Sequence, residues 1–566
     1  MQKYPTWPNL AAMMFTCARQ WPSKPMLRDW RDGAWHSTTW GEFARMTASC
    51  ARALRAAGVS AGDRVLLCAE NRPEYPIAET ALMAIRAVPV PAYVTNTAED
   101  HAHLLRDSGA RVAIVSTPAL ADRVRQGAAS LGGLDMLVVM DAPKDAQPPV
   151  VAWRVLVADH RPADDIAAEA ATIPSGAMAC IIYTSGTGGA PRGVMLPHKS
   201  ILSNCAGAFE LVRPLKLKDE TYLSYLPLAH AYEHTVGQFF LLSIGSEVVY
   251  SRGVEHLAAD MMTVRPTILT AVPRVLDVIR SRVLGQVARE KPLKQRLFHE
   301  AVRIGEKKAE GVRLNLLERA VDPVLDRMVR AKVRNRFGGR LVAAISGGAR
   351  LEPAVGRFFL SMGLCIMQGY GQTEAGPVIS ANPPDAIRID TVGVALEGVD
   401  LRIAEDGEIL VRGDLVMDGY WGRTRDSETT IIDGWLHTGD IGELDNGYLR
   451  ITDRKKDMIV LSGGENVSPA KIEGRLMAEP EIAQAVVTGD GKAGLSALIV
   501  PADGVDEEAV AHGIARANKR LSVTERIRKH AIVPPFTIEN GLLTPSQKIR
   551  RTLVIRANLQ TLEAMY

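Results

Sequence analysis

A run of glycines, hydroxyl side chains and one cation at residues 183–193 is the part of this sequence whose residue types point most directly to chemistry. The run reads YTSGTGGAPRG and follows a strand-like apolar segment, residues 179–183. Glycines let backbone N–H groups approach phosphate oxygens, and hydroxyls with a cation such as Arg192 complete an anion site. The spacing fits neither G-x-x-x-x-G-K-[ST] nor G-x-G-x-x-G, which disfavours kinase-like P-loops and dinucleotide folds. Alone, such a loop is equally well explained as a structural turn.

Further motifs follow this loop, and their order gives it meaning. They are residues 226–230 (LPLAH), 346–349 (SGGA), 368–374 (QGYGQTE), 435–440 (WLHTGD), Arg454 and 545–548 (PSQK). This ordered set resembles the adenylate-forming superfamily and, within it, the long-chain fatty acyl-CoA ligases, over nearly the whole chain. The resemblance implies an enzyme that activates a fatty acid with ATP as its acyl-adenylate. The acyl group would then pass to coenzyme A, with release of AMP and diphosphate.

The resemblance implies an ATP site that also takes Mg²⁺. Thr184 and Glu374 would form the Mg²⁺ site, because a carboxylate is a hard oxygen ligand. Tyr370 would stack on the adenine, while Asp440 would accept hydrogen bonds from the ribose hydroxyls, which Arg454 would also reach. The residues implied to bind ATP or AMP are Thr184, Ser185, Gly186, Thr187, Gly188, Arg192, Gly347, Gly348, Ala349, Gly369, Tyr370, Gly371, Thr373, Asp440 and Arg454.

Three residues are implied to act in catalysis. His230 would border the acyl pocket and orient the carboxylate, although a single His in an apolar stretch is more often a core residue. Lys548 would contact the substrate carboxylate, where an ammonium offsets charge as the carboxylate attacks the α-phosphate. Glu374 would act through the metal. Glu233 fits the long-chain form of the motif, but the resemblance gives it no role.

A different set of residues is implied for the transfer to coenzyme A. Residues 461–466 (LSGGEN) resemble the loop that lines the pantetheine tunnel, with Gly463, Gly464 and Glu465 at its centre. In relatives the C-terminal domain swings so that this loop replaces the catalytic lysine. Lys456 occupies the hinge position for that swing.

Further segments of the sequence bear on the identity of the substrate. Residues 272–275 and 418–421, and a basic helical insert, look like the long-chain branch. Arg192 stands where lysine is commoner, so its planar fork can change the phosphate contacts. Two alternatives stay open: a ligase for another carboxylic acid or for a carrier-protein acceptor, and a non-catalytic nucleotide or acyl binder. Joint retention of Thr184, Glu374, Asp440, Arg454 and Lys548 argues against the binder.

The elements that must position these motifs indicate an α/β fold. Short apolar runs at 64–68, 112–115 and 137–140 alternate with helical stretches, such as the one that follows the capping box at 39–42. We expect a large multilayer N-terminal domain with mixed or parallel sheets, residues 1–455. A small, mobile α+β domain, residues 456–566, would follow the charged segment DRKKD. Asp406-Gly407 and Asn446-Gly447 predict tight hairpins.

Residues 280–340 differ from the rest of the chain. They hold 17 Lys/Arg against 7 Asp/Glu, a local excess of +10 in a chain whose total is +3. Apolar residues recur there at helical spacing, which predicts two or three basic amphipathic helices. The alternatives are an ordinary solvated surface and a patch that meets anionic lipid or the phosphates of coenzyme A.

The bulk composition sets wider limits. At 566 residues the chain is long enough for at least two folding units, and its mild charge argues against nucleic acid as a partner. The start, residues 1–16, lacks the pattern of a signal peptide, and the six scattered cysteines predict buried thiols in a reducing compartment. We therefore expect a cytoplasmic enzyme, with peripheral contact at the inner membrane face and a homodimer both left open.

Overall fold

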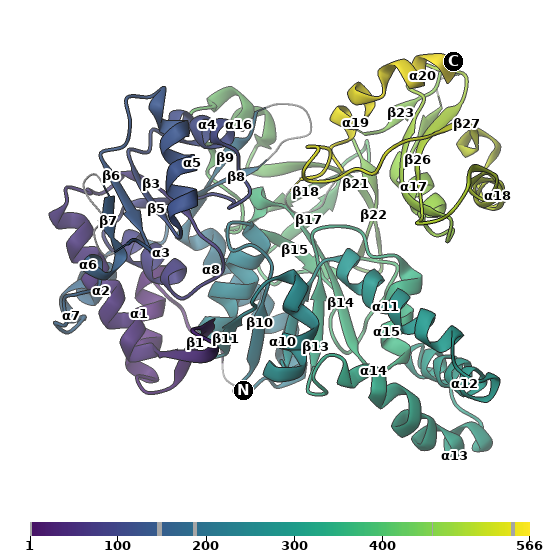
Figure 1. The fold of residues 1–566 in the computed structure, drawn as a ribbon, viewed down its shortest axis with the longest axis horizontal. Coiled ribbons are helices and arrows are strands. Elements are labelled where there is room, and N and C mark those ends of the chain that lie inside the picture. Colours follow the sequence, from purple (N-terminus) through teal and green to yellow (C-terminus); the bar gives the residue numbers. More distant parts are fainter. Residues whose placement is uncertain are drawn as a thin grey trace. The chain divides into compact units, whose positions relative to one another are not determined.

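The chain folds into two compact units. The computed structural model describes residues 3–143, 150–184, 190–455, 457–463, 465–544 and 549–565. Unit 1 consists of the described residues of 1–184, 192–400 and 411–436, and unit 2 of those of 185–191, 401–410 and 437–566. Figure 1 traces both units.

The first sheet of unit 1 is parallel and covered by helices on both faces. Its strand order is β4-β3-β5-β6-β7. Helices α4 and α5 pack on one face, and α2 and α3 lie on the other (Figure 1). The elements are β3 (Arg64–Cys68), β4 (Val88–Pro91), β5 (Val112–Val115), β6 (Met136–Val139), β7 (Val150–Ala152), α2 (Trp40–Ala56), α3 (Glu74–Ala84), α4 (Ala98–Ser108) and α5 (Pro118–Ala129). Because helices cover both faces of this sheet, the sequences of its strands are nearly continuously apolar.

The second sheet of unit 1 has a parallel centre with antiparallel edges. Strands β14, β13, β12, β10, β11 and β1 are adjacent in that order and parallel. Strand β2 pairs antiparallel with β1, and beyond β14 the sheet continues antiparallel through β15 and β16 (Val394–Ala395). Its strands are β1 (Pro25–Arg31), β2 (Ala34–Thr39), β10 (Thr221–Ser224), β11 (Glu247–Tyr250), β12 (Ile268–Ala271), β13 (Ala343–Ser346), β14 (Cys365–Gly371) and β15 (Val378–Ala381). The segments that follow β10, β12, β13 and β14 therefore leave the sheet at one edge, where α/β folds usually bind ligands.

A small antiparallel sheet, in the order β19-β9-β8, completes unit 1. Its strands are β8 (Met178–Thr184), β9 (Arg192–Pro197) and β19 (Gly419–Tyr420). Asp107, in α4, anchors the sheet from one side. Its carboxylate accepts a hydrogen bond from the Tyr183 hydroxyl at 2.7 Å, and its backbone oxygen accepts one from the Trp421 indole at 3.0 Å.

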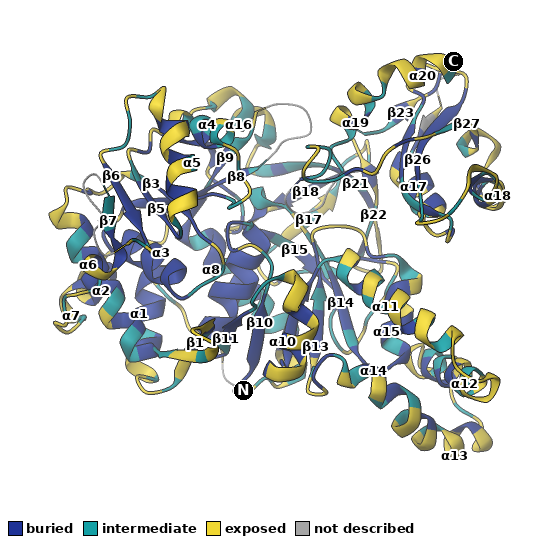
Figure 2. Ribbon diagram, viewed as in Figure 1, coloured by how far each residue is buried: buried dark blue, intermediate teal, exposed yellow. Residues whose placement is uncertain are grey.

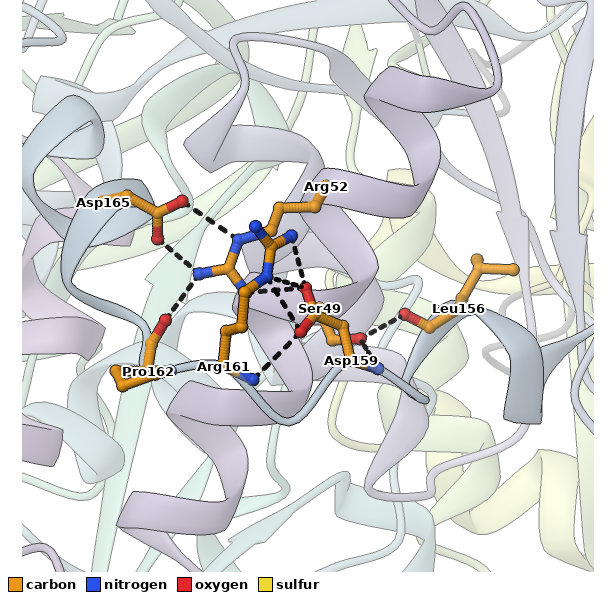
Figure 3. Close-up of polar contacts among 7 residues, drawn as sticks. All are labelled: Ser49, Arg52, Leu156, Asp159, Arg161, Pro162 and Asp165. Carbon is orange, nitrogen blue, oxygen red and sulfur yellow. Dashed lines mark hydrogen bonds and ion pairs between the residues drawn. The ribbon is translucent and has the colours of Figure 1, made fainter.

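An ion-pair cluster fixes the chain against α2 before it enters β8 (Figure 3). Arg52 donates to Asp159 at 3.1 Å and to Asp165 at 3.0 Å, and Arg161 closes on Asp159 at 2.7 Å. Ser49 donates to the Leu156 carbonyl at 2.8 Å. Because exposed ion pairs add little free energy, we infer that this cluster fixes how the segment 156–165 lies against α2 and contributes little to stability.

Four helical segments form the basic region, whereas the sequence predicts two or three. They are α11 (Pro273–Ala288), α12 (Pro292–Ala309), α13 (Leu316–Leu325) and α14 (Ala331–Asn335), and a π-helical turn, η4 (Asp326–Arg330), joins the last two. Phe298 of α12 packs with Leu276 of α11 and Phe358 of α15 (Pro353–Ser361) in the core beneath the second sheet. This core fixes α11 and α12 to unit 1.

Unit 2 holds the hairpin β21 (Trp435–Asp445) and β22 (Tyr448–Arg454) and a separate three-stranded sheet. The sheet order is β25 (Ile482–Thr488), β26 (Leu495–Pro501) and β27 (Ile527–Ile532), with helices α17 (Pro469–Met477), α18 (Glu507–Asn518), α19 (Arg551–Ala557) and α20 (Leu559–Met565). Ala485 and Val487 join the core with α17 and α18, whereas Val486 joins the core with α19 and α20. Side chains alternate across a strand, so one sheet serves both cores.

Most local sequence signals are confirmed. The Thr39–Glu42 capping box opens α2, β3 and β5 have the expected bounds, and Asn446 and Gly447 both have positive φ in the β21–β22 turn. The third apolar run forms β6 one residue earlier than expected. Five cysteines are buried, but Cys365 is only half-buried, so the prediction of buried thiols is wrong there. Together these elements give the predicted α/β fold with a smaller α+β unit.

Candidate functional site

The glycine-rich loop connects two antiparallel strands, β8 and β9, which fix both of its ends. Thr184 ends β8 and Arg192 begins β9, and the two are direct partners across the antiparallel pair. Ser185, Gly186, Thr187 and Gly188 lie outside the described residues. The hairpin therefore presents one hydroxyl and one guanidinium side by side at the base of the loop.

Arg192 is linked to Glu374 through Tyr420. The Arg192 Nη2 donates to the Tyr420 hydroxyl at 3.1 Å, and the guanidinium lies 4.0 Å from the centre of the same ring. The Tyr420 hydroxyl in turn donates to Glu374 Oε1 at 2.9 Å. Burial, and then the charge of Glu374, raise the pKa of Tyr420, so the phenol keeps its proton and acts as the donor. We call these three residues the Arg192–Tyr420–Glu374 array.

Tyr420 is a site residue that the motif analysis missed. Its segment, residues 418–421, was interpreted only as a mark of the long-chain branch. The position of β19 beside β9 brings Tyr420 opposite Val194. The sequence did contain an indication, because the tyrosine of the D-G-Y-W run carries a hydroxyl that can form hydrogen bonds. Only the strand pairing shows which residues that hydroxyl connects.

Glu374 follows β14 in a tight turn. It lies in η5 (Thr373–Ala375), and its backbone oxygen accepts a hydrogen bond from the Met417 N–H at 2.9 Å. Gly371 is required just before it, since a Cβ there would overlap the Pro377 carbonyl. The predicted residues Gly369, Tyr370, Gly371 and Thr373 thus occupy the end of β14 and this turn.

The predicted Ser-Gly-Gly-Ala motif leaves the neighbouring strand at the same edge. Gly347 follows β13 and its N–H donates to the Ala271 carbonyl at 3.0 Å, while Gly348 has φ +80°. Tyr232 packs against Gly347, where a Cβ would come within 3.0 Å of its ring. Because β13 and β14 are parallel neighbours, Gly347, Gly348 and Ala349 and the Gly369–Gly371 stretch lie together at this edge.

His230 reaches the same edge from the segment after β10. Its Nδ1 accepts from the Tyr232 N–H at 3.2 Å, which leaves the proton of a neutral ring on Nε2. The Tyr232 hydroxyl donates to the Ile345 carbonyl at 2.9 Å, and so joins this segment to β13. Asn71 donates to the Leu226 carbonyl at 2.7 Å, which holds the start of the LPLAH motif. These contacts fix the ring of a half-buried histidine.

Beneath His230, Glu233 is fully buried in a network of hydroxyls. Its carboxylate accepts hydrogen bonds from Tyr222 at 2.7 Å, Ser224 at 2.6 Å and Thr270 at 2.9 Å. Burial raises the pKa of Glu233 to about 7, while these hydrogen bonds act in the opposite direction. The donors come from β10 and β12, so Glu233 ties both strand ends to the π-helix η2 (Glu233–Phe240). The structure thus gives Glu233 a structural role, whereas the family resemblance assigned it none.

Unit 2 holds the other predicted nucleotide residues. Asp440 and Arg454 are direct partners across the β21–β22 hairpin, with Arg454 Nε 3.2 Å from Asp440 Oδ1. Asp440 is buried and Arg454 is exposed. Gly463 and Glu465 lie in the turn between β23 (Ile459–Val460) and β24 (Asn466–Val467), and the Leu461 N–H donates to the Glu465 carbonyl at 2.9 Å.

Three predicted residues of this part of the chain, Lys456, Gly464 and Lys548, lie outside the described residues. The residues on either side of the PSQK motif are nonetheless well anchored. Leu543 and Ile549 form an antiparallel bridge, and Arg551 pairs with the buried Glu473 at 2.6 Å. Arg551 also donates to the Val487 carbonyl at 2.7 Å, so the start of α19 is fixed to α17 and β25.

The protein side chains at this site suit a metal ion that takes most of its ligands from water and from a bound phosphate compound. Within the described ranges, no three His, Cys, Asp or Glu side chains gather as a metal cage. Glu374 offers one carboxylate whose Oε1 already accepts from Tyr420. Mg²⁺ commonly takes one or two carboxylates and completes its shell with water and phosphate oxygens. Thr184 and Glu374 fit such a site and do not fit an all-protein one.

Comparisons with known proteins agree along the whole chain. The family model for AMP-binding enzymes matches residues 14–421, and that for the AMP-binding enzyme C-terminal domain matches residues 456–566. The long-chain-fatty-acid–CoA ligase FadD15 of Mycobacterium bovis is 34% identical over 99% of this chain and 97% of its own. The long-chain-fatty-acid–CoA ligase 5 of Mus musculus is 30% identical over 88% and 79%. The solved structure of ATP-bound MatB from Rhodopseudomonas palustris, 23% identical, shares the fold over 98% of this chain and 99% of its own, with a TM-score of 0.73.

Proposed function

The chain belongs to the AMP-binding enzyme family, and we propose that it is an AMP-forming ligase that joins a long-chain fatty acid to coenzyme A. The observation that carries the proposal is the 34% identity to a long-chain-fatty-acid–CoA ligase across 99% of the chain. The geometry of unit 1 supports it, because the glycine-rich segment after β13 and the Glu374 carboxylate after β14 lie at the same edge of the second sheet.

In the first half-reaction, a carboxylate oxygen of the acid attacks the α-phosphorus of ATP and the bond to the β-phosphate breaks. Diphosphate leaves and the acyl-adenylate remains. Mg²⁺ bound with ATP would offset charge on the departing diphosphate. Arg192 supplies a fixed positive charge beside the loop, and Tyr420 holds both Arg192 and Glu374 in place for it. Asp440 would accept hydrogen bonds from the ribose, and Lys548 would approach the reacting carboxylate.

In the second half-reaction, the thiolate of coenzyme A attacks the acyl carbon and the bond to AMP breaks. His230 borders the acyl site in this proposal, with its ring held by the Tyr232 N–H. Gly463, Gly464 and Glu465 would line the pantetheine path, and Lys456 would be the hinge between residues 1–455 and 456–566. The start of the C-terminal family match at residue 456 supports that boundary.

Peripheral contact with membranes is part of the proposal, since long-chain acids partition into lipid. In the part of the chain that the structure describes, no helix is both long and apolar enough to cross a bilayer. We propose that the contact comes from a surface of the folded protein.

A panel of acids tests the substrate. The values of kcat/KM for acetate, octanoate, palmitate and benzoate, with ATP and coenzyme A, are expected to rise towards the longer aliphatic chains. Preference for acetate or benzoate would contradict the proposal. Adenylate without thioester would point to a carrier-protein acceptor, and no AMP at all to a non-catalytic binder.

A further inference from the structure

Helix α13 and the π-turn η4 present an unusual surface at the periphery of unit 1, where Figure 2 shows much of α13 as exposed. Leu317, Val321, Val324 and Met328 follow at intervals of four, three and four residues, which places them on one face of a helix. Their exposed fractions are 79%, 42%, 54% and 49%. An amphipathic helix of a globular protein normally turns its apolar face inward. Here an apolar stripe faces outward.

The carboxylates of the same helix are turned inward and neutralised. Glu318 is buried and pairs with Arg303 at 2.8 Å and Lys307 at 2.6 Å, both from α12. Asp322 pairs with Lys308 at 2.7 Å and with the buried Arg330 at 2.6 Å. This arrangement explains why the helix is oriented with its apolar stripe outward, because the ion pairs hold the opposite face against α12.

The third carboxylate of this segment, Asp326, pairs with Arg334 at 2.7 Å. Residues 312–335 contain no other Asp or Glu. The charges left on the outside are therefore cationic. Arg327 and Lys332 are exposed and lie next to Met328, one residue before it and four residues after it, and neither forms an ion pair with a carboxylate among the residues that the structure describes. The outer surface of α13, η4 and the start of α14 thus combines an apolar stripe with cations.

We propose that this surface, Leu317, Val321, Val324 and Met328 with Arg327 and Lys332, docks the protein on the interface of an anionic lipid bilayer. Apolar side chains would enter the boundary between headgroups and acyl chains, while the two cations meet lipid phosphates. A second copy of the chain is a poorer occupant, because isologous packing would set these cations against one another. The inference rests on the proposed function, since docking would bring the site to a substrate dissolved in lipid.

Vesicle sedimentation of the full chain tests the surface. Wild-type protein should co-sediment with vesicles of phosphatidylcholine and phosphatidylglycerol at low salt, and much less with phosphatidylcholine alone. Arg327→Gln with Lys332→Gln should weaken partition roughly 30-fold, at about 1 kcal/mol per cation near an anionic surface. Leu317→Gln with Val324→Gln should also reduce binding, at every salt concentration. The matched controls Lys519→Gln with Arg526→Gln, and Val155→Gln with Met262→Gln, change exposed residues elsewhere and should bind as wild type.

Several outcomes would overturn the docking surface. They are absence of wild-type binding, equal binding to neutral vesicles, and patch variants that bind as well as their controls. A change of molecular mass in light scattering for Leu317→Gln with Val324→Gln would assign the surface to a second copy instead. Thioester formation from octanoate without vesicles separates this inference from the proposed function. Folded variants of the docking surface should retain that activity. Absence of the activity in the wild type would count against the ligase, and the vesicle binding of wild type and variants would then decide the docking surface by itself.

Discussion

Two glutamates of unit 1 each accept a hydrogen bond from a tyrosine, yet their surroundings suit them for opposite roles. Glu233 is fully buried and receives three hydroxyl donors, from Tyr222, Ser224 and Thr270. Glu374 is half-buried and, among the residues that the structure describes, accepts a side-chain hydrogen bond from Tyr420, which also contacts Arg192. A carboxylate whose hydrogen bonds are satisfied internally holds elements together, whereas one that is partly satisfied and accessible can act on a ligand.

Glu374→Gln should have the largest effect on activity. The amide oxygen can still accept from Tyr420, so the fold is retained, but the charge is lost. Removal of one preorganised electrostatic group typically costs about 10²–10³ in rate. We expect adenylation to fall by that order in a single-turnover assay while the Tm stays within a few degrees. Adenylation near the wild-type rate would show that Glu374 is not part of the site.

Glu233→Ala should instead act on stability. It leaves the Tyr222, Ser224 and Thr270 hydroxyls without their shared acceptor, and each buried unsatisfied group costs about 1–3 kcal/mol. We expect the free energy of unfolding in urea to drop by about 3 kcal/mol or more. The control Glu405→Ala removes an exposed carboxylate and should change it by less than about 0.5 kcal/mol. Equal losses for both variants would refute the structural role of Glu233.

The pH dependence of stability sharpens the same contrast. Burial raises the pKa of Glu233 to about 7, above the value of about 4.3 expected in the unfolded chain. Between these values the folded state binds more protons than the unfolded state, so the contribution of Glu233 is full below pH 4 and is lost as pH rises to 7. In Glu233→Gln, this decline in stability between about pH 4 and 7 should be reduced. A slope unchanged from wild type would mean that Glu233 ionises normally.

Tyr420→Phe should have the smallest effect. It keeps the ring beneath Arg192 but removes the hydroxyl that bridges to Glu374. Loss of one hydrogen bond to a charged group costs about 1.5–3 kcal/mol at most, so we expect kcat/KM for ATP to fall about 10-fold. Tyr250→Phe, a change at a buried tyrosine in β11, is the control and should leave kcat/KM unchanged. Identical behaviour of the two variants would contradict the positioning role of Tyr420.

Local signals in the sequence predicted local structure well. The capping box at Thr39 and Glu42 determines where α2 starts, because both partners lie within one helical turn. The Asn446-Gly447 pair determines a hairpin because both residues adopt positive φ with little strain. The family resemblance implied that Gly347 and Tyr370 serve one adenine site, and the parallel strands β13 and β14 bring both residues to one edge.

Contacts between residues far apart in the chain could not be predicted in the same way. Arg192 and Tyr420 are 228 positions apart and meet only because β19 pairs with β9. The direction of α13 was equally hidden. Its periodicity predicts a helix, but which face turns inward depends on the ion pairs that Glu318 and Asp322 make with α12.

In the reaction that we propose, catalysis proceeds through an acyl-adenylate that is made first and consumed second. The most direct test is a single-turnover reaction with palmitate and ATP in the absence of coenzyme A, followed by a chase with coenzyme A. We predict that palmitoyl-AMP accumulates with one diphosphate per adenylate, and that the chase converts it to palmitoyl-CoA with release of AMP. Formation of thioester with ADP and phosphate, or without any adenylate before the chase, would contradict the account.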